Sequence, residues 1–247
     1  MQVDITPERK AARRKLIRAG AFITYEDNHL IGLSKRSGLL SQGGPKGHVS
    51  LPDILDDYRR EAEGKPGKAY IGIVHRLDRN TSGAMVVAKT SKAAGRLAKL
   101  FRDRADELQK TYLAWVERHL EKPEGELVHR LRRDSGVTKI AAPGDDDARE
   151  ARLRYRMDGK GKFCARLEID LETGLPHQIR AQLSHIGHPI WGDKKYGGTP
   201  WRRPALHART LAFPHPVGGD LITVMAPVPE DLKELDERRN MRPPVEG

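Results

Sequence analysis

The strongest constraint on the fold of this chain is a series of short apolar runs with a period of two. Residues 163–171 alternate clearly, with Phe163, Ala165, Leu167, Ile169 and Leu171 on one face. This period is typical of a β-strand with one buried face. Further strands are expected over 21–34 (two strands around a turn at Asp27), 71–74, 84–89, 111–116, 126–132, 149–157, 206–213 and 221–225.

Helical patterns are few. They cover 50–63, 91–107, 177–186 and 229–239, while residues 6–18 form either a short basic helix or a flexible arm. In the first of these, Ser50 is suited to cap the helix, and Leu51, Ile54, Leu55 and Tyr58 share one face. Strands joined by short turns, with only a few helices between them, predict an α+β fold around a mixed, mostly antiparallel central sheet.

The charge of the chain narrows its partners. Among 247 residues, 45 Lys and Arg stand against 34 Asp and Glu, so the net charge is +11 and the pI about 9.8. Such an excess favours a polyanion through phosphate contacts, although it also serves solubility. There is no apolar run of about 20 residues and no apolar signal-peptide core, so we expect a cytoplasmic protein that does not enter membranes. The single cysteine, Cys164, excludes an internal disulfide.

Residues 75–83, HRLDRNTSG, form a polar segment between two apolar runs. Rigid flanks hold such a loop in place, and loops held in this way often carry functional residues. Asp78 stands between Arg76 and Arg79, and hydroxyl groups follow it. Taken alone, these residues fit either a catalytic carboxylate or one that caps a turn beside two solvated arginines.

The same segment resembles the HRLDxxTSG signature of RluA-type pseudouridine synthases. The resemblance implies that Asp78 is the essential catalytic carboxylate. It also implies that Arg76 enters the RNA stack and helps to displace the target nucleotide. His75 and Thr81 belong to the same motif and are expected to contact the RNA.

Three further segments resemble motifs of this family, and all stand in the family's order. Residues 110–114 (KTYLA) are similar to KxYxA, which implies that Tyr112 packs on the target base. Residues 172–197 resemble TGRxHQIRxHLxxIGHPIxGDxxYG, which implies that Arg180 pairs with the catalytic carboxylate and that His177 and Gln178 meet RNA. Residues 206–216 resemble LHAxxLxFxHP.

The family reaction breaks the N1–C1′ bond of a uridine, turns the uracil and joins C5 to C1′. Nothing enters or leaves, so the resemblance implies no cofactor and no metal. A carboxylate can stabilise charge at C1′, attack this carbon or remove a sugar proton, and the sequence leaves these roles open. A stacked uridine must first leave its stack, and stacking on Tyr112 would return about 1–3 kcal/mol.

The resemblance covers residues 21–232, which we expect to form a single catalytic domain with a cleft across its sheet. Residues 1–20 are then a basic N-terminal segment, and 233–247 a C-terminal tail that is expected to fray. Three positions depart from the family pattern: Leu175 replaces Arg, Arg36 replaces Pro, and Gln182 replaces His.

Two other functions fit parts of the sequence. His177, His185 and His188 lie close together and suggest a metal hydrolase, but the chain has neither HExxH nor paired cysteines. The basic charge fits a non-catalytic RNA-binding or ribosome assembly factor equally well, although such a protein would not need Asp78, Tyr112 and Arg180 together. We expect a monomer that acts on ribosomal or transfer RNA without an obligate protein partner.

Overall fold

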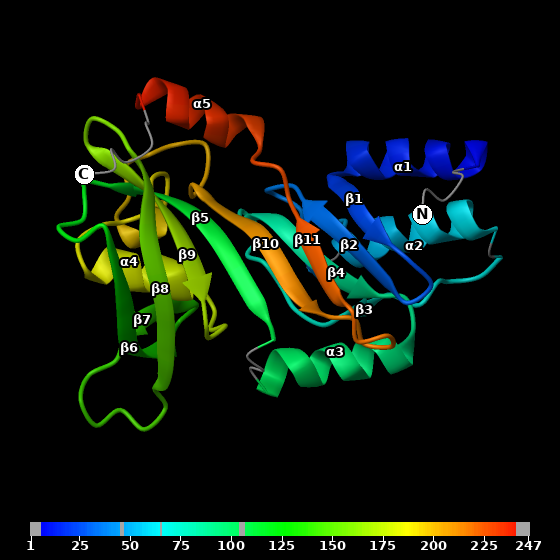
Figure 1. Ribbon diagram of the computed structural model, residues 1–247, viewed down its shortest axis with the longest axis horizontal. Coiled ribbons are helices and arrows are strands. Elements are labelled where there is room, and N and C mark those ends of the chain that lie inside the picture. Colours follow the sequence, from blue (N-terminus) through cyan, green and yellow to red (C-terminus); the bar gives the residue numbers. More distant parts are fainter. Residues whose placement is uncertain (1–5, 45–46, 65, 104–106, 241–247) are drawn as a thin grey trace. The chain divides into compact units, whose positions relative to one another are not determined.

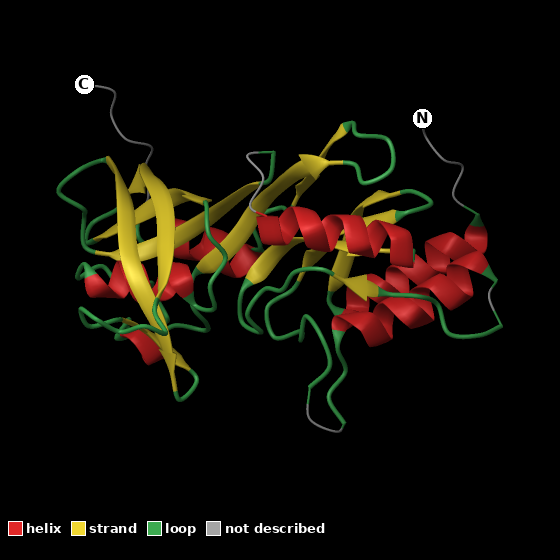
Figure 2. Cartoon of the chain, turned by 90° about the horizontal axis from the view of Figure 1, so that it is seen from below, coloured by secondary structure: helices red, strands yellow, loops and turns green. Residues whose placement is uncertain are grey.

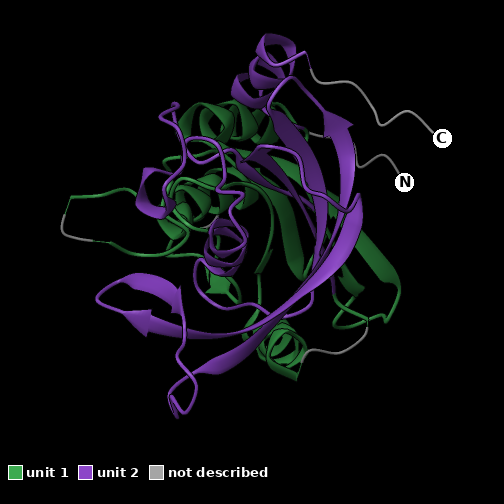
Figure 3. Cartoon of the chain, turned by 90° about the vertical axis from the view of Figure 1, so that its left-hand side faces the viewer, with its two compact units in different colours: residues 1–108, 210–227 green, residues 109–209, 228–247 purple. Residues whose placement is uncertain are grey.

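The structure is a computed structural model that describes residues 6–44, 47–64, 66–103 and 107–240. The chain divides into two compact units, coloured separately in Figure 3. Unit 1 contains residues 1–108 and 210–227, and unit 2 contains residues 109–209 and 228–247. The domain boundaries expected at residues 20 and 232 stay a prediction, and residues 241–247 of the expected tail lie outside the described ranges.

Unit 1 is built on antiparallel strands (Figure 1). β1 (Ala21–Glu26) pairs with β2 (Leu30–Lys35), and β2 pairs with β4 (Ser82–Ala88). β3 (Gly72–Ile73) also pairs with β4, and β11 (Leu221–Met225) pairs with the part of β10 (Leu206–Pro214) that belongs to this unit. These strands were predicted, but β4 begins at Ser82, so the end of the polar HRLDRNTSG segment is already sheet.

Three helices accompany these strands in the described part of unit 1: α1 (Pro7–Ala19), α2 (Leu51–Glu63) and α3 (Ser91–Asp103). Residues 7–19, for which a helix or an arm was expected, are therefore a helix. The four apolar residues predicted for one face of α2 are all buried. α3 begins at Ser91 as expected, and Thr90 caps it, because Thr90 Oγ1 accepts the Ala93 N–H.

The core of unit 1 lies between α3 and the strands. Figure 2 shows α3 lying across them. Leu97 of α3 packs in one cluster with Val86 of β4 and Phe213 of β10, and none of these three side chains is exposed. Every residue of β4 is buried, as expected for a strand covered on both faces.

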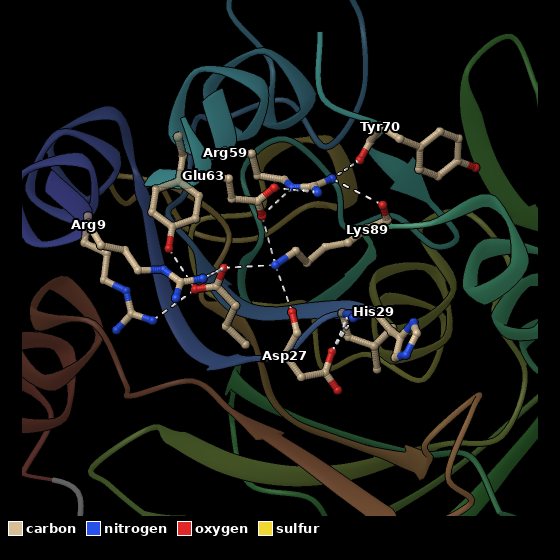
Figure 4. Close-up of polar contacts among 11 residues, drawn as sticks. Arg9, Asp27, His29, Arg59, Glu63, Tyr70 and Lys89 are labelled. Atoms are coloured by element: carbon tan, nitrogen blue, oxygen red, sulfur yellow. Dashed lines mark hydrogen bonds and ion pairs between the residues drawn. The ribbon is translucent and has the colours of Figure 1, made fainter. Parts of the chain in front are cut away.

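A buried polar network holds α1 and α2 to the strands of unit 1 (Figure 4). Its centre is Glu26, whose side chain is 4% exposed. The carboxylate pairs with Arg9 and Arg13 of α1 at 3.1 Å each and with Lys89 at 3.3 Å. Tyr58 of α2 donates its hydroxyl to the same carboxylate at 2.7 Å. One carboxylate therefore links β1 to both helices.

Lys89 extends this network to the end of α2. Its ammonium group pairs with Glu63 at 3.0 Å and donates to the carbonyl oxygen of Asp27 at 2.8 Å. Arg59 binds Glu63 through two nitrogens, at 3.0 and 2.9 Å, and donates to the carbonyl oxygen of Tyr70 at 2.6 Å. The side chains thus satisfy one another's charges, as burial requires.

Unit 2 contains an antiparallel sheet in the order β5 (Gln109–Glu117), β9 (Cys164–Leu171), β8 (Arg149–Lys160), β6 (Glu124–Asp134) and β7 (Val137–Ile140). β7 was not predicted, because its four residues give too short a pattern. It forms a tight hairpin with β6 through Ser135 and Gly136, which both have positive φ. Phe163, the first member of the predicted alternating series, lies before β9 and is 71% exposed.

The described helices of unit 2 are α4 (Gln178–His185), a short 3-10 turn (Lys194–Tyr196) and α5 (Glu230–Arg238). Two aspartates of α5 bind other parts of unit 2. Asp236 accepts a hydrogen bond from Trp115 Nε1 at 2.5 Å, and Asp231 pairs bidentately with Arg203. The sheet core and α4 meet in one cluster that includes Leu167, Ile169 and Leu183. Within the described residues, no helix is long and apolar enough to cross a membrane.

The Glu26 network predicts a pH-dependent contribution to stability. Burial acts to raise the pKa of Glu26, but the hydrogen bond from Tyr58 and the surrounding cations outweigh it and lower the pKa. Such a group stabilises the folded state above its unfolded pKa, near 4.5, and this contribution is lost as the pH falls through the lower folded value. We expect Glu26→Gln to reduce the free energy of unfolding by about 3 kcal/mol at neutral pH.

Urea denaturation between pH 7 and pH 3 measures both effects, and the variant should lose less stability on acidification than the parent. Glu61→Gln is the control, because Glu61 pairs with Lys15 at an exposed position and should change stability by less than about 0.5 kcal/mol. Equal losses in the two variants would contradict a special role for Glu26.

Candidate active site

The loop that carries Asp78 is held by its own backbone and by a neighbouring segment. The N–H of Thr81 donates to the carbonyl oxygen of Asp78 at 3.0 Å, which closes a tight turn through Arg79. Gly38 and Arg79 bond reciprocally: the Gly38 N–H donates to the Arg79 carbonyl at 2.8 Å, and Arg79 Nε donates to the Gly38 carbonyl at 3.1 Å. The Asp78 side chain is half-buried at the end of this fixed turn.

Two buried side chains attach this turn to residues 35–41. Lys35 is fully buried, and its ammonium group donates to the carbonyl oxygens of Leu39 at 2.9 Å and Arg79 at 3.2 Å. The hydroxyl of Ser41 donates to the carbonyl oxygen of Leu77 at 2.6 Å and accepts the Leu77 N–H at 3.1 Å. The residues on either side of Asp78 are therefore fixed by side chains that lie about 40 positions earlier in the chain.

The other predicted residues of this segment differ in exposure. Arg76 is exposed, as a residue that enters an RNA stack must be, whereas Thr81 is 3% exposed. His75 Nε2 accepts the Val86 N–H at 3.0 Å, and its ring stacks on Phe101 of α3 with centroids 4.5 Å apart. These contacts favour positioning roles for Thr81 and His75, and their contact with RNA stays a prediction.

Arg180, in unit 2, lies on α4 with its side chain 10% exposed. Its Nε and Nη2 bind the two carboxylate oxygens of Asp193 at 2.6 and 2.7 Å, a bidentate pair that holds the guanidinium in one plane. Gly192, directly before Asp193, has a φ of 81°, and any side chain there would collide with the carbonyl oxygen of Arg203. Asp78 belongs to unit 1, so the predicted pairing of Arg180 with Asp78 stays a prediction.

Tyr196 packs on the same guanidinium. Arg180 lies over its ring, 4.9 Å from the centroid, and the Tyr196 hydroxyl accepts the Thr138 N–H at 3.0 Å. The hydroxyl also lies 3.0 Å from Nδ1 of His177, which caps α4 with a left-handed φ of 54°. Burial raises the pKa of Tyr196, so its phenol remains protonated at neutral pH.

The remaining predicted residues of unit 2 are Tyr112 and Gln178. Tyr112 lies on β5 opposite Ile169 of β9 and is partly buried against the core of this unit. Gln178 is 2% exposed, and its amide oxygen accepts from the Thr173 hydroxyl at 2.7 Å and from the Leu175 N–H at 3.1 Å. Gln178 thus holds the turn before α4, which favours a positioning role.

The departures from the family pattern have defined places. Gln182 is fully buried, and its amide nitrogen donates to the carbonyl oxygens of Leu127 and Ala151 at 3.1 Å each, which attaches α4 to β6 and β8. Leu175 packs in a small cluster beside α4, and Arg36 is exposed.

Sequence reasoning did not assign roles to Lys35, Ser41, Asp193 and Tyr196. Two of them, Asp193 and Tyr196, stand inside the quoted motifs. A buried guanidinium such as that of Arg180 calls for a nearby acid, so Asp193 could have been found. Ser41 gave no signal, because its two hydrogen bonds depend on tertiary contact alone.

Three histidines suggested a metal hydrolase, but each of them contacts a different neighbour. His177 contacts Tyr196, His185 packs edge-on against His129, and His188 Nδ1 lies 3.1 Å from the carbonyl oxygen of Glu117. Among the described residues, no three His, Cys, Asp or Glu side chains are grouped so that they could hold a metal ion.

Solved structures show the fold to which this chain belongs. The structure of human RNA pseudouridylate synthase domain containing 4 matches with a TM-score of 0.78 at 23% identity, over 96% of this chain and 98% of that one. The structure of human RNA pseudouridylate synthase domain containing 1 matches with a TM-score of 0.72 at 24% identity, over 92% of this chain and 91% of that one. The chain therefore has the α+β fold of a pseudouridylate synthase domain.

Sequence comparisons identify the family. The family model described as RNA pseudouridylate synthase matches residues 29–185. Ribosomal large subunit pseudouridine synthase D of Xanthomonas campestris pv. campestris is 35% identical, over 86% of this chain and 67% of that protein. Ribosomal large subunit pseudouridine synthase C of Escherichia coli is 31% identical, over 98% of this chain and 80% of that protein. The chain belongs to the RNA pseudouridylate synthase family, of the RluA type, and is an enzyme that isomerises uridine in RNA.

Ser41 should act on catalysis through the position of Asp78. Ser41→Ala removes both hydrogen bonds to Leu77, and a small displacement of a reacting group can lower turnover by up to about 100-fold. We expect kcat for pseudouridine formation to fall by about 10- to 100-fold while KM for RNA changes little.

Ser41→Thr keeps the hydroxyl and should restore most of the lost turnover. Circular dichroism and thermal denaturation check that all variants are folded at the assay temperature. A parallel loss of kcat and stability that threonine does not restore would contradict the positioning role.

Asp193 should be needed to keep Arg180 in place. Asp193→Asn leaves a buried guanidinium without its counter-charge, so we expect a loss of about 3–5 kcal/mol in the free energy of unfolding and a large loss of activity at a temperature where the variant is folded. Asp231→Asn is the matched control, because Asp231 of α5 makes the same bidentate contact with Arg203. It should lower stability and leave turnover of the folded protein unchanged.

Proposed function

We propose that Asp78 is the catalytic carboxylate of this RNA pseudouridine synthase and that RNA of the large ribosomal subunit is its substrate. The observation that carries the first part is the fixed turn around Asp78. Its flanking residues are bound by Ser41 and Lys35, while the carboxylate itself is only half-buried. Preorganisation of this kind suits a group that must meet a reacting carbon in one geometry.

In the proposed reaction, the carboxylate of Asp78 acts at the target ribose. It either attacks C1′ as the N1–C1′ bond breaks or removes a sugar proton, and both routes release uracil for rotation. C5 then bonds to C1′, the proton on C5 is lost and N1 gains a proton, so the product is an isomer of the substrate. No cofactor or metal takes part.

Three further residues complete the proposed site. Tyr112 stacks on the uracil, and Arg76 occupies the space that the displaced nucleotide leaves in the RNA. Arg180 pairs with Asp78 and favours its ionised form. His75, Thr81, His177 and Gln178 hold the segments that carry these groups.

The proposed substrate rests on the relatives whose names specify the ribosomal large subunit, including proteins of both the D and the C type. The net charge of +11 supports a polyanionic partner. We expect the enzyme to work in the cytoplasm as a monomer, without an obligate protein partner.

Asp78→Asn tests the catalytic assignment. The amide keeps the size of the side chain but can neither attack C1′ nor accept a proton, so pseudouridine formation should fall by at least about 1000-fold. RNA affinity should stay within about threefold of the parent. Pseudouridine is measured by chemical labelling of unmodified ribosomal RNA, and binding by filter retention.

Asp57→Asn is the control, because Asp57 is an exposed aspartate on α2. Measurable turnover by Asp78→Asn at a rate near the parent's would sink the assignment. If the parent protein binds RNA tightly but forms no pseudouridine in ribosomal or transfer RNA, a non-catalytic binding or assembly factor becomes the better account.

A further inference from the structure

Helix α3 presents a row of cations on its outer face. Lys92, Arg96 and Lys99 are exposed, and their spacings of four and three residues place them on one side of the helix. Arg102 is exposed one turn further on and pairs with Asp103 at 3.5 Å. From Lys92 to Lys99 the row covers about 10 Å along the helix axis, which is longer than the spacing of successive phosphates along one strand.

Many cations in the described part of the chain have acidic partners, whereas Lys92, Arg96 and Lys99 make no ion pair with a described residue. On α1, Arg9 and Arg13 are paired with Glu26, and Lys15 is paired with Glu61. Four arginines of the sheet in unit 2 are paired in the same way: Arg152, Arg154, Arg156 and Arg166 with Glu126, Glu172, Glu168 and Asp158. Lys92 and Lys99 make no ion pair with any described residue, so their charge is available to an outside anion.

An apolar groove runs beside this row. Its lining residues are Arg96, Leu97, Lys99, Leu100 and Asp103 of α3, Pro214 at the end of β10, and His215 and Pro216 directly after it. The carboxylate of Asp103 pairs with Arg102. Arg96 donates to the carbonyl oxygen of Pro216 at 2.6 Å, which holds one wall of the groove against the helix. An apolar surface bordered by cations matches a nucleotide, because a base or ribose offers an apolar face and the adjoining phosphate a charge.

The same helix also contacts the catalytic segment. Phe101 of α3 stacks on His75, three residues before Asp78. Both lie in unit 1, so the cationic row and the loop of Asp78 are parts of one compact body. An RNA whose target uridine is at Asp78 is therefore bound at the same unit that bears this row.

We propose that α3 is a second RNA contact of this enzyme, at which the phosphates of a strand outside the target nucleotide bind Lys92, Arg96 and Lys99 and one nucleotide lies in the groove beside Leu100. The proposal rests on the enzyme's action on RNA. In this proposal α3 contributes to the affinity for RNA and takes no part in the isomerisation.

The double variant Lys92→Ala/Lys99→Ala tests this contact, because both side chains are exposed and should be dispensable for folding. Binding of unmodified large-subunit ribosomal RNA and of a uridine oligomer is measured at several salt concentrations. Each lost phosphate contact lowers the slope of log K against log salt by about 0.7–0.9. We expect the slope to fall by about 1.5 and the affinity near 0.1 M salt to drop about tenfold.

Lys10→Ala/Arg14→Ala is the matched control, because it removes the same charge from exposed positions of α1 in the same unit. It should weaken binding by less than about threefold. Unchanged slope and affinity in the α3 variant would overturn the proposal, and so would an equal loss in the control, which would indicate that only total charge matters. Pseudouridine formation by the parent protein is recorded on the same RNA, so a failure of the proposed substrate is seen separately from a failure of the α3 contact.

Discussion

The catalytic assignment depends on one constraint, the attachment of the Asp78 turn to residues 35–41. A buried ammonium group and a buried hydroxyl satisfy backbone carbonyls on both sides of Asp78. Each of these polar groups would be costly to bury alone, and each is paired with a backbone group that also needs a partner. Breaking one of these hydrogen bonds would leave a buried polar group without a partner, which is unfavourable. This penalty keeps the loop in one conformation.

A second polar constraint acts within unit 2, at α4. The bidentate pair of Arg180 and Asp193 fixes a guanidinium on α4, and Tyr196 covers it. Buried pairs of this kind add little net stability compared with apolar packing, but they fix geometry, because a charge left alone in the same place would be strongly unfavourable. In both units the structure thus uses buried polar contacts to position the groups on which the proposed chemistry relies.

Cations in this protein fall into two groups with different tasks. Arginines and lysines such as Arg9, Lys89 and Arg203 have acidic partners and hold helices to sheets. Lys92 and Lys99 on α3 have no such partner among the described residues and remain exposed. Part of the net charge of +11 is therefore carried by exposed side chains of α3, the helix that contacts His75 in the segment of Asp78.

The sequence by itself determined most strands and helices, because their periodicity and caps are local signals. It also determined the family, because motifs such as residues 75–83 and 172–197 survive as contiguous residues. It could not determine the hairpin strand β7, whose four residues carry too little pattern. Only the tertiary structure decided what fixes the site: Ser41 on Leu77, Lys35 on Arg79 and Asp193 on Arg180 join residues that are 13 to 44 positions apart. Such bonds follow from how the chain folds back on itself, and no local pattern encodes them.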